Sequence, residues 1–276
     1  MALAWMDFHV QKRRDVPIYS LSRRHPSAIS SLIDTLDSQP TTPPSLYIDL
    51  EGVNLGRHGT IALVEVHVSP LRRTYLIDVH ALGGEAFTAP SPTTGRTLQA
   101  VLEDEAIPKV FFDVRHDSDA LHGLYGIRLA GVRDLQLMEL ATRSQVGLNG
   151  DGDVVSLSRE RVRDLAACIK CDARLSLEER EAWDAAKVEG RMLFVPAFGG
   201  RYEVFSERPL KEEIMRYCVQ DVQFLPSMWA YYEPKLTPDW EERVRKAERD
   251  RVALSLAPEF FGGKHMALAP EGWSSL

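Results

Sequence analysis

Three short stretches rich in apolar and β-branched residues follow one another between residues 46 and 79, with turn residues between them. They span residues 47–50, 61–68 and 74–79. The connection at residues 69–73 is short enough for a hairpin. This pattern predicts an antiparallel three-stranded meander.

The hydrophobic period then alternates between the values typical of helices and strands. Helices are predicted at 97–105, 117–125 and 135–143, and short strands at 109–112 and 132–134. A meander followed by alternating strands and helices favours an α/β fold, in which helices pack on the faces of one mixed sheet.

The remaining pattern is mainly helical. We expect helices at 27–38, 158–171, 176–188, 210–229 and 238–254, with a bend near Pro226 and a loop at 145–154. Residues 1–40 form an N-terminal extension with a short helix in this interpretation. The main domain then spans 41–236, and 237–276 form a C-terminal helix and a loosely attached tail.

Composition limits the classes of protein to consider. The 276 residues are 44% hydrophobic, which is enough to bury a core, and no apolar run is long enough to span a bilayer. Charge appears at Asp7, before a signal-peptide core could form, and three cysteines cannot make a disulfide framework. We therefore expect an intracellular protein, cytoplasmic or nuclear. The net charge of −7 argues against coating nucleic acid through bulk positive charge.

Candidate chemistry begins with the acidic pair at the end of the first strand. Asp49 and Glu51 point to the same side of that strand, while Ile48 and Leu50 face the other way. Late in the chain, Tyr217 and Asp221 stand one turn apart on a helix. Between them, Asp117 lies at the start of a helix. Each acid alone has a simpler explanation, because Asp117 suits a helix cap and the others suit a solvated surface.

The combined pattern resembles the tyrosine-bearing (DEDDy) branch of the DEDD superfamily of 3'-to-5' exonucleases. That branch includes ribonuclease D and the Werner-type exonuclease domain. The chain looks most similar to exonuclease-domain proteins related to Egalitarian. The phrases that carry the resemblance are Ile48-Asp49-Leu50-Glu51-Gly52, Asp117 followed by Gly126-Ile127, and Tyr217-Cys218-Val219-Gln220-Asp221. The resemblance implies a ribonuclease H-like fold, with a five-stranded mixed sheet flanked by helices.

It also implies a mechanism in which Asp49, Glu51, Asp117 and Asp221 hold two divalent cations. All-oxygen ligation suits Mg²⁺ or Mn²⁺, held about 4 Å apart, and Tyr217 would orient the attacking water. By resemblance, Glu51 also contacts the terminal 3'-hydroxyl. Without cations these carboxylates would repel one another, which argues against a merely structural cluster.

The chain departs from the ribonuclease D pattern at Phe112, where a histidine is common. Asp113 and Asp119 are rivals of Asp117, although the distance to Gly126-Ile127 favours Asp117. Candidate contacts to substrate phosphates are five basic side chains: Arg57, His58, Arg115, His116 and Arg216.

The expected partner is a single-stranded 3' end, of RNA or DNA. The alternatives are a catalytically weak RNA-binding scaffold of the same fold and a ribonuclease H-like enzyme that cuts internally. The Tyr217 and Asp221 pair disfavours internal cutting.

Overall fold

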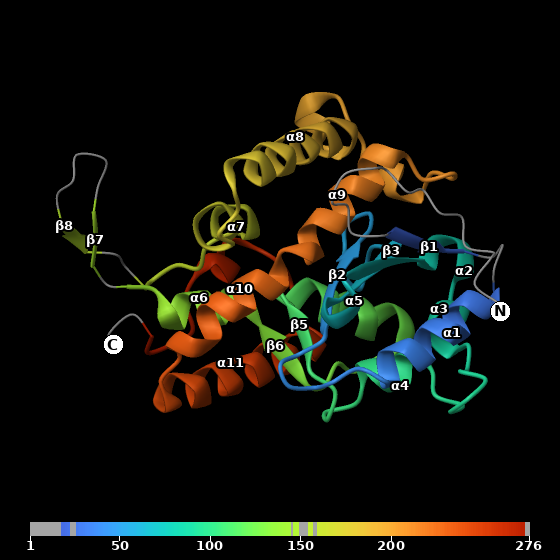
Figure 1. The fold of residues 1–276 in the computed structure, drawn as a ribbon, viewed down its shortest axis with the longest axis horizontal. Helices are drawn as coiled ribbons and strands as arrows, with labels where there is room; N and C mark the ends of the chain where they lie inside the picture. Colours follow the sequence, from blue (N-terminus) through green and yellow to red (C-terminus); the bar gives the residue numbers. More distant parts are fainter. Residues whose placement is uncertain (1–17, 23–25, 145, 149–153, 157–158, 274–276) are drawn as a thin grey trace.

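A six-stranded mixed sheet forms the centre of the protein (Figure 1). The computed structural model describes residues 18–22, 26–144, 146–148, 154–156 and 159–273. Strands β2 (Leu46–Glu51), β3 (Leu63–Val68) and β4 (Arg73–Asp78) form the expected antiparallel meander. Strands β5 (Lys109–Phe111) and β6 (Val132–Asp134) continue the sheet in parallel from β2. The sheet order is β1-β4-β3-β2-β5-β6.

The prediction of five strands was wrong, because the N-terminal extension supplies a sixth. β1 (Ile18–Leu21) pairs in parallel with β4, Tyr19 stacks on Tyr75 with ring centroids 5.1 Å apart, and Leu21 is buried. Four residues are too few to show an alternating period in the sequence. The charged residues at 12–15 and 23–24 lie outside the described part of the chain.

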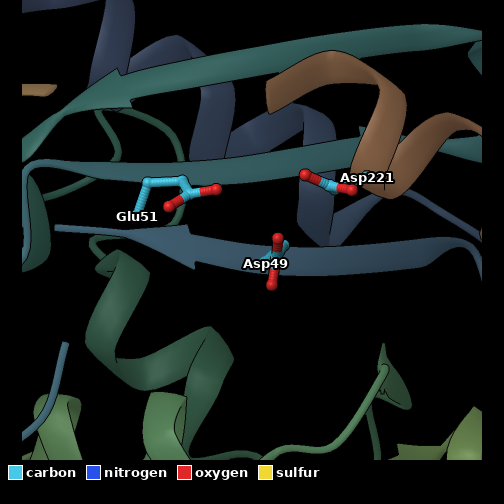
Figure 2. Close-up of side chains that lie close together, drawn as sticks. All are labelled: Asp49, Glu51 and Asp221. Carbon is cyan, nitrogen blue, oxygen red and sulfur yellow. The ribbon is translucent and has the colours of Figure 1, made fainter. Parts of the chain in front are cut away.

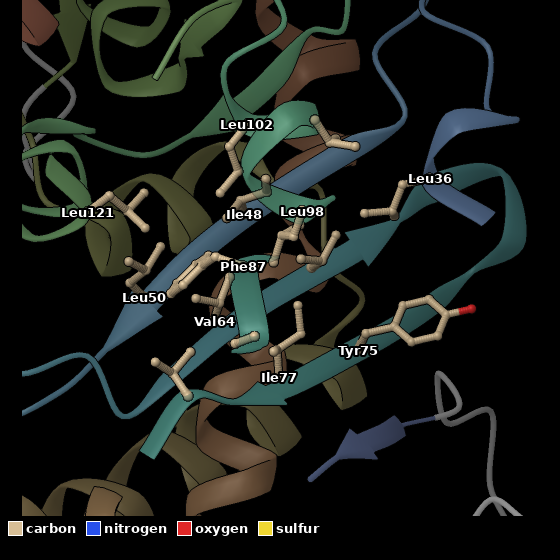
Figure 3. Close-up of a cluster of buried hydrophobic side chains, with 14 of the residues drawn as sticks. Leu36, Ile48, Leu50, Val64, Tyr75, Ile77, Phe87, Leu98, Leu102 and Leu121 are labelled. Atoms are coloured by element: carbon tan, nitrogen blue, oxygen red, sulfur yellow. The ribbon is translucent and has the colours of Figure 1, made fainter. Parts of the chain in front are cut away.

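The two faces of the sheet bury different helices. The face that carries Ile48 and Leu50 packs against α1 (Pro26–Asp37), α4 (Leu98–Leu102) and α5 (Arg115–Tyr125) (Figure 3). Two short helices, α2 (Val79–Leu82) and α3 (Glu85–Thr88), follow β4. The opposite face contacts α9 (Glu212–Gln223) through β2, β3 and β4. Residues 49 and 51 therefore face α9.

The second half of the chain is mostly helical, with α6 (Leu135–Thr142), α7 (Leu165–Asp172), α8 (Leu177–Phe194), α10 (Leu225–Tyr232) and α11 (Pro238–Leu256). Ser176 and Glu179 form a capping box at the start of α8. Helix α9 ends before Phe224, and α10 has Pro226 in its first turn. The helix expected at 210–229 is therefore divided into two close to this proline. Short 3₁₀ turns occur at Ser69–Leu71, Pro196–Phe198, Tyr202–Ser206, Glu233–Lys235 and Lys264–Ala267.

The segment expected to be a loop at 145–154 contains strands. β7 (Val146–Leu148) and β8 (Val154–Ser156) pair antiparallel, and this hairpin projects from the main body in Figure 1. The acidic turn at 149–153 lies outside the described residues.

Helix α11 packs along α5, α6 and β6. Arg251 Nη1 donates to Asp134 Oδ2 at 2.6 Å, and the backbone N–H of Asp134 donates to Glu248 at 2.8 Å. Farther along, Trp273 is buried and its ring meets that of Trp240 edge to face. The residues after 236 are thus joined to the sheet domain by buried polar and aromatic contacts. Within the described residues, the helices lack the combination of length and apolar character needed to cross a membrane.

Candidate metal centre

Two neighbouring elements bring three carboxylates together. Asp49 and Glu51 project from β2 toward α9, and Asp221 projects back from α9 (Figure 2). One carboxylate oxygen from each of the three lies within 4.8 Å of the others. This separation allows one cation to contact all three side chains.

Asp117 comes from helix α5, which follows the neighbouring strand β5. Its helix α5 follows β5, which runs parallel to β2, so α5 begins near the end of β2 that carries the acidic pair. Asp117 is buried, and its Oδ1 has no hydrogen-bond partner within the described residues. Burial raises the pKa of Asp117 well above its ordinary value, and the Asp49 carboxylate raises it further. Asp117 therefore lies within electrostatic reach of Asp49, although it is outside the group of three carboxylates.

The two rivals of Asp117 are engaged elsewhere. Asp113 pairs with Arg115, with Oδ1 2.5 Å from Nε and Oδ2 2.6 Å from Nη2. Asp119 accepts from the backbone N–H of Arg57 at 2.8 Å and pairs with its guanidinium. Both carboxylates are neutralised by arginine, whereas Asp117 is not. Of these three aspartates, Asp117 is thus the one without an arginine partner among the described residues.

Burial and mutual repulsion hold protons on the cluster. Burial, and then the Asp221 carboxylate, raise the pKa of Asp49 to about 7. The pKa of Glu51 is raised well above its ordinary value by burial and then by Asp49 and Asp221. Divalent cations would remove this penalty, because they stabilise the ionised carboxylates. The donor set, made of carboxylate oxygens, fits Mg²⁺ or Mn²⁺.

Tyr217 lies one turn before Asp221 and is held by aromatic contacts. Its ring meets Phe194 edge to face at 4.9 Å. Burial, and then the Asp221 carboxylate, raise the pKa of the Tyr217 hydroxyl far above its ordinary value. The hydroxyl therefore stays protonated and can orient a water molecule, but it is a poor base.

The sequence reasoning missed two charged residues at this site. Lys187 on α8 donates from Nζ to Asp221 Oδ1, and its Nζ lies 3.7 Å from the centroid of the Tyr217 ring. A helical spacing of Trp183, Lys187, Gly190 and Phe194 was visible in the sequence and indicates one face of α8. It does not reveal which element that face meets.

Glu65 is the second missed residue. It lies opposite Asp49 in the β2–β3 register and has no exposed surface. No N–H or O–H group of the described residues donates to either of its carboxylate oxygens. Burial, followed by Asp49 and Glu51, raises the pKa of Glu65 well above its ordinary value. In the sequence, the sign that Glu65 is buried was its position between apolar residues within a predicted strand.

The five basic candidates for substrate contact have different surroundings. Arg57 donates to the carbonyl oxygens of Ser255 and Pro258 as well as to Asp119, and Arg115 donates to that of Met266. These two arginines therefore hold the C-terminal segment. His58 is exposed, His116 is half-buried, and Arg216 pairs with Glu189 at 3.2 Å.

Residues 25–155 match the 3'-5' exonuclease family. That match includes Asp49, Glu51 and Asp117 and ends before α9. The piRNA biogenesis protein EXD1 of Homo sapiens is 29% identical over 177 residues, which are 62% of this chain and 33% of the human protein. The protein of the same name from Mus musculus is 38% identical over 95 residues, or 34% of this chain and 15% of the mouse protein. The chain thus matches a third or less of the length of these curated relatives.

Solved structures share the fold at low sequence identity. Ribonuclease D of Trypanosoma brucei, in a complex with RNA U12, superposes with a TM-score of 0.67 and is 19% identical. The alignment covers 94% of this chain and 78% of that one. Escherichia coli ribonuclease D gives a TM-score of 0.54 at 16% identity, covering 86% and 52%. These likenesses show a ribonuclease H-like fold. Residues 25–155 are thus similar to 3'-5' exonuclease domains, and the fold of the chain is similar to that of ribonuclease D.

Proposed function

We propose that this protein is a metal-dependent 3'-to-5' exonuclease acting on single-stranded nucleic acid. The observation that carries the proposal is the convergence of Asp49, Glu51 and Asp221, with oxygens within 4.8 Å of one another; Asp221 is buried and the other two are half-buried. Asp117, buried and lacking a hydrogen-bond partner on Oδ1 within the described residues, supports a second cation position beside Asp49. A buried acidic group of this kind is costly without cations.

In this proposal each residue has a defined task. Asp49, Glu51 and Asp221 would hold one cation, and Asp117 together with Asp49 would hold a second. The cations, Mg²⁺ or Mn²⁺, would supply activation of water and stabilise the leaving 3'-oxygen. Tyr217 orients the attacking water through its neutral hydroxyl. Glu51 also recognises the terminal 3'-hydroxyl, which restricts attack to an end.

Contact to the rest of the substrate is proposed for three exposed or half-buried basic groups near this site. His58 is exposed in the loop after β2, and His116 is in the first turn of α5 beside Asp117. Arg216 is on α9, next to Tyr217, and its pair with Glu189 is partly exposed, so a phosphate can compete for it. Arg57 and Arg115 would contact phosphate only if they left their internal partners.

The test is cleavage of a 5'-labelled single-stranded oligonucleotide, as RNA and as DNA, with Mg²⁺ or Mn²⁺. We expect a ladder shortened from the 3' end, and no cleavage of a circular substrate. Asp49→Asn should lower the rate by more than about a hundredfold, which exceeds the usual loss for an outer-shell partner of a metal. Asp250→Asn, an exposed aspartate on α11, is the matched control and should cleave normally.

A second candidate is a nucleic-acid-binding scaffold with little or no cleavage. It is favoured by the ion pair between Lys187 and Asp221, because an ammonium beside a candidate ligand opposes cation binding. Intact oligonucleotide in the presence of tight binding would support the scaffold and contradict the enzyme. Cleavage that is lost in Asp49→Asn, with binding retained, would support the enzyme.

A further inference from the structure

Lys187 places a positive charge inside the candidate metal centre. Its Nζ donates to Oδ1 of Asp221, and the Asp221 carboxylate is one of the three that converge with Asp49 and Glu51. The side chain of Lys187 is 12% exposed and that of Asp221 is 7% exposed. An ion pair so well shielded from water interacts more strongly than a surface pair.

A row of side chains on α8 holds the ammonium in this position. Lys187, Gly190 and Phe194 lie on one face of the helix and all meet Tyr217. A Cβ on Gly190 would lie 2.7 Å from the Cβ of Tyr217, so glycine permits this close approach of α8 to α9. The packing of α8 on α9 therefore places the Lys187 ammonium beside Asp221.

From these contacts we propose that Lys187 is a built-in counter-ion that competes with divalent cations for Asp221. This inference rests on the proposed metal centre and adds a control on its occupancy. In the metal-free protein the ammonium compensates part of the negative charge of Asp49, Glu51 and Asp221. When a divalent cation binds these carboxylates, the ammonium gives up Asp221.

Besides Asp221, the Lys187 ammonium already has two other partners that can retain it after it leaves the carboxylate. The Tyr217 ring offers a cation–π contact, and the Tyr217 carbonyl oxygen lies 3.5 Å from Nζ. Lysine suits this exchange, since its compact charge sits on a flexible stem with three rotatable donors. Arginine, with a planar fork, would bind the carboxylate more rigidly.

The test is calorimetric titration of the metal-free protein with Mn²⁺, compared between wild type and Lys187→Met. Methionine keeps much of the side-chain length and removes the charge. We expect Lys187→Met to bind Mn²⁺ at least about tenfold more tightly, because a like charge next to the cation is removed. The matched control is Lys246→Met on α11, which removes an exposed lysine from a pair with Asp250 and should leave the affinity unchanged.

Thermal unfolding gives a second measurement that does not depend on activity. Lys187→Met should lower the melting temperature of the metal-free protein and lower it less at saturating Mn²⁺. If that variant does not fold, Lys187→Gln replaces it, since glutamine retains hydrogen bonding to Asp221 without the charge.

The outcomes separate this inference from the proposed function. Unchanged or weaker Mn²⁺ binding in the lysine variants, with clear binding by the wild type, would overturn the role of Lys187 and leave the metal centre standing. No Mn²⁺ binding by any of the proteins would overturn both. If Lys187→Met binds Mn²⁺ and the wild type does not, Lys187 competes strongly enough to keep the cation out of the wild-type protein, which supports the inference.

Discussion

His67 shows how strongly the face of the sheet beneath α9 excludes water. Its ring is 4% exposed, and its Nδ1 lies 2.9 Å from the hydroxyl of Thr74. Burial, with a smaller effect of Arg72, lowers the pKa of His67 to about 4. The same face carries Asp49 and Glu65, whose pKa values burial shifts upward. In each case the shift favours the neutral form of the group.

The low pKa of His67 predicts a specific loss of stability in acid. The unfolded chain takes up a proton near pH 6.5 and the folded protein only near pH 4, so stability falls as pH decreases between these values. The loss is on the order of 2–3 kcal/mol. His67→Gln should remove this part of the pH dependence, as measured by urea unfolding at pH 7 and pH 4.5. His80→Gln, at an exposed position, is the control, and equal slopes for both variants and the wild type would contradict the prediction.

At the scale of elements, the turn between β5 and α5 determines where Asp117 points. Asp134, at the end of β6, accepts hydrogen bonds from the backbone N–H groups of Asp113 and Val114, at 3.0 and 3.2 Å. Asp113 has a positive φ of 63°, an uncommon conformation for a residue other than glycine. Arg251 of α11 compensates the charge of Asp134. Helix α11 thus supports, through Asp134, the turn that leads into Asp117.

Removing Arg251 should therefore lower stability and disturb the turn that leads into Asp117. Arg251→Met leaves the fully buried Asp134 carboxylate without its main counter-charge, at a cost of about 3–5 kcal/mol. Urea unfolding measures this loss, and Arg249→Met, on the exposed side of α11, should change stability by less than about 0.5 kcal/mol. Adding Asp134→Asn to Arg251→Met should recover part of the loss. Strictly additive effects of the two substitutions would show that the pair does not act as proposed.

The elements differ in how far the sequence could predict them. Alternation in β2 was sufficient to place Asp49 and Glu51 on one face, because the side-chain period of a strand is fixed by its backbone. Helix α11 was also predicted, but its charged sequence gave no sign that Glu248 and Arg251 are buried. The contact of Lys187 with Asp221 depends on how α8 lies across α9, and no local pattern encodes that arrangement.

At the scale of the whole molecule, chain segments outside the central meander complete the domain. β1 is added to the sheet beside β4, and at the opposite edge α11 packs against β6 and the helices α5 and α6. β1 is then the edge strand on this side of the sheet, and a strand of four residues leaves few unpaired backbone groups for association between molecules. The boundary that the sequence suggested at residue 40 separates β1 from the sheet to which it is hydrogen-bonded.

The contribution of β1 can be measured without deleting any of the chain. Leu21 is 1% exposed and belongs to the same apolar cluster as Ile77, its partner in the register with β4. Leu21→Ala should lower the free energy of unfolding by about 2–4 kcal/mol, as expected for a buried leucine. Ser20→Ala, at the neighbouring exposed position, should change it by less than about 0.5 kcal/mol. If β1 were a dispensable extension, the two variants would unfold at the same urea concentration as the wild type.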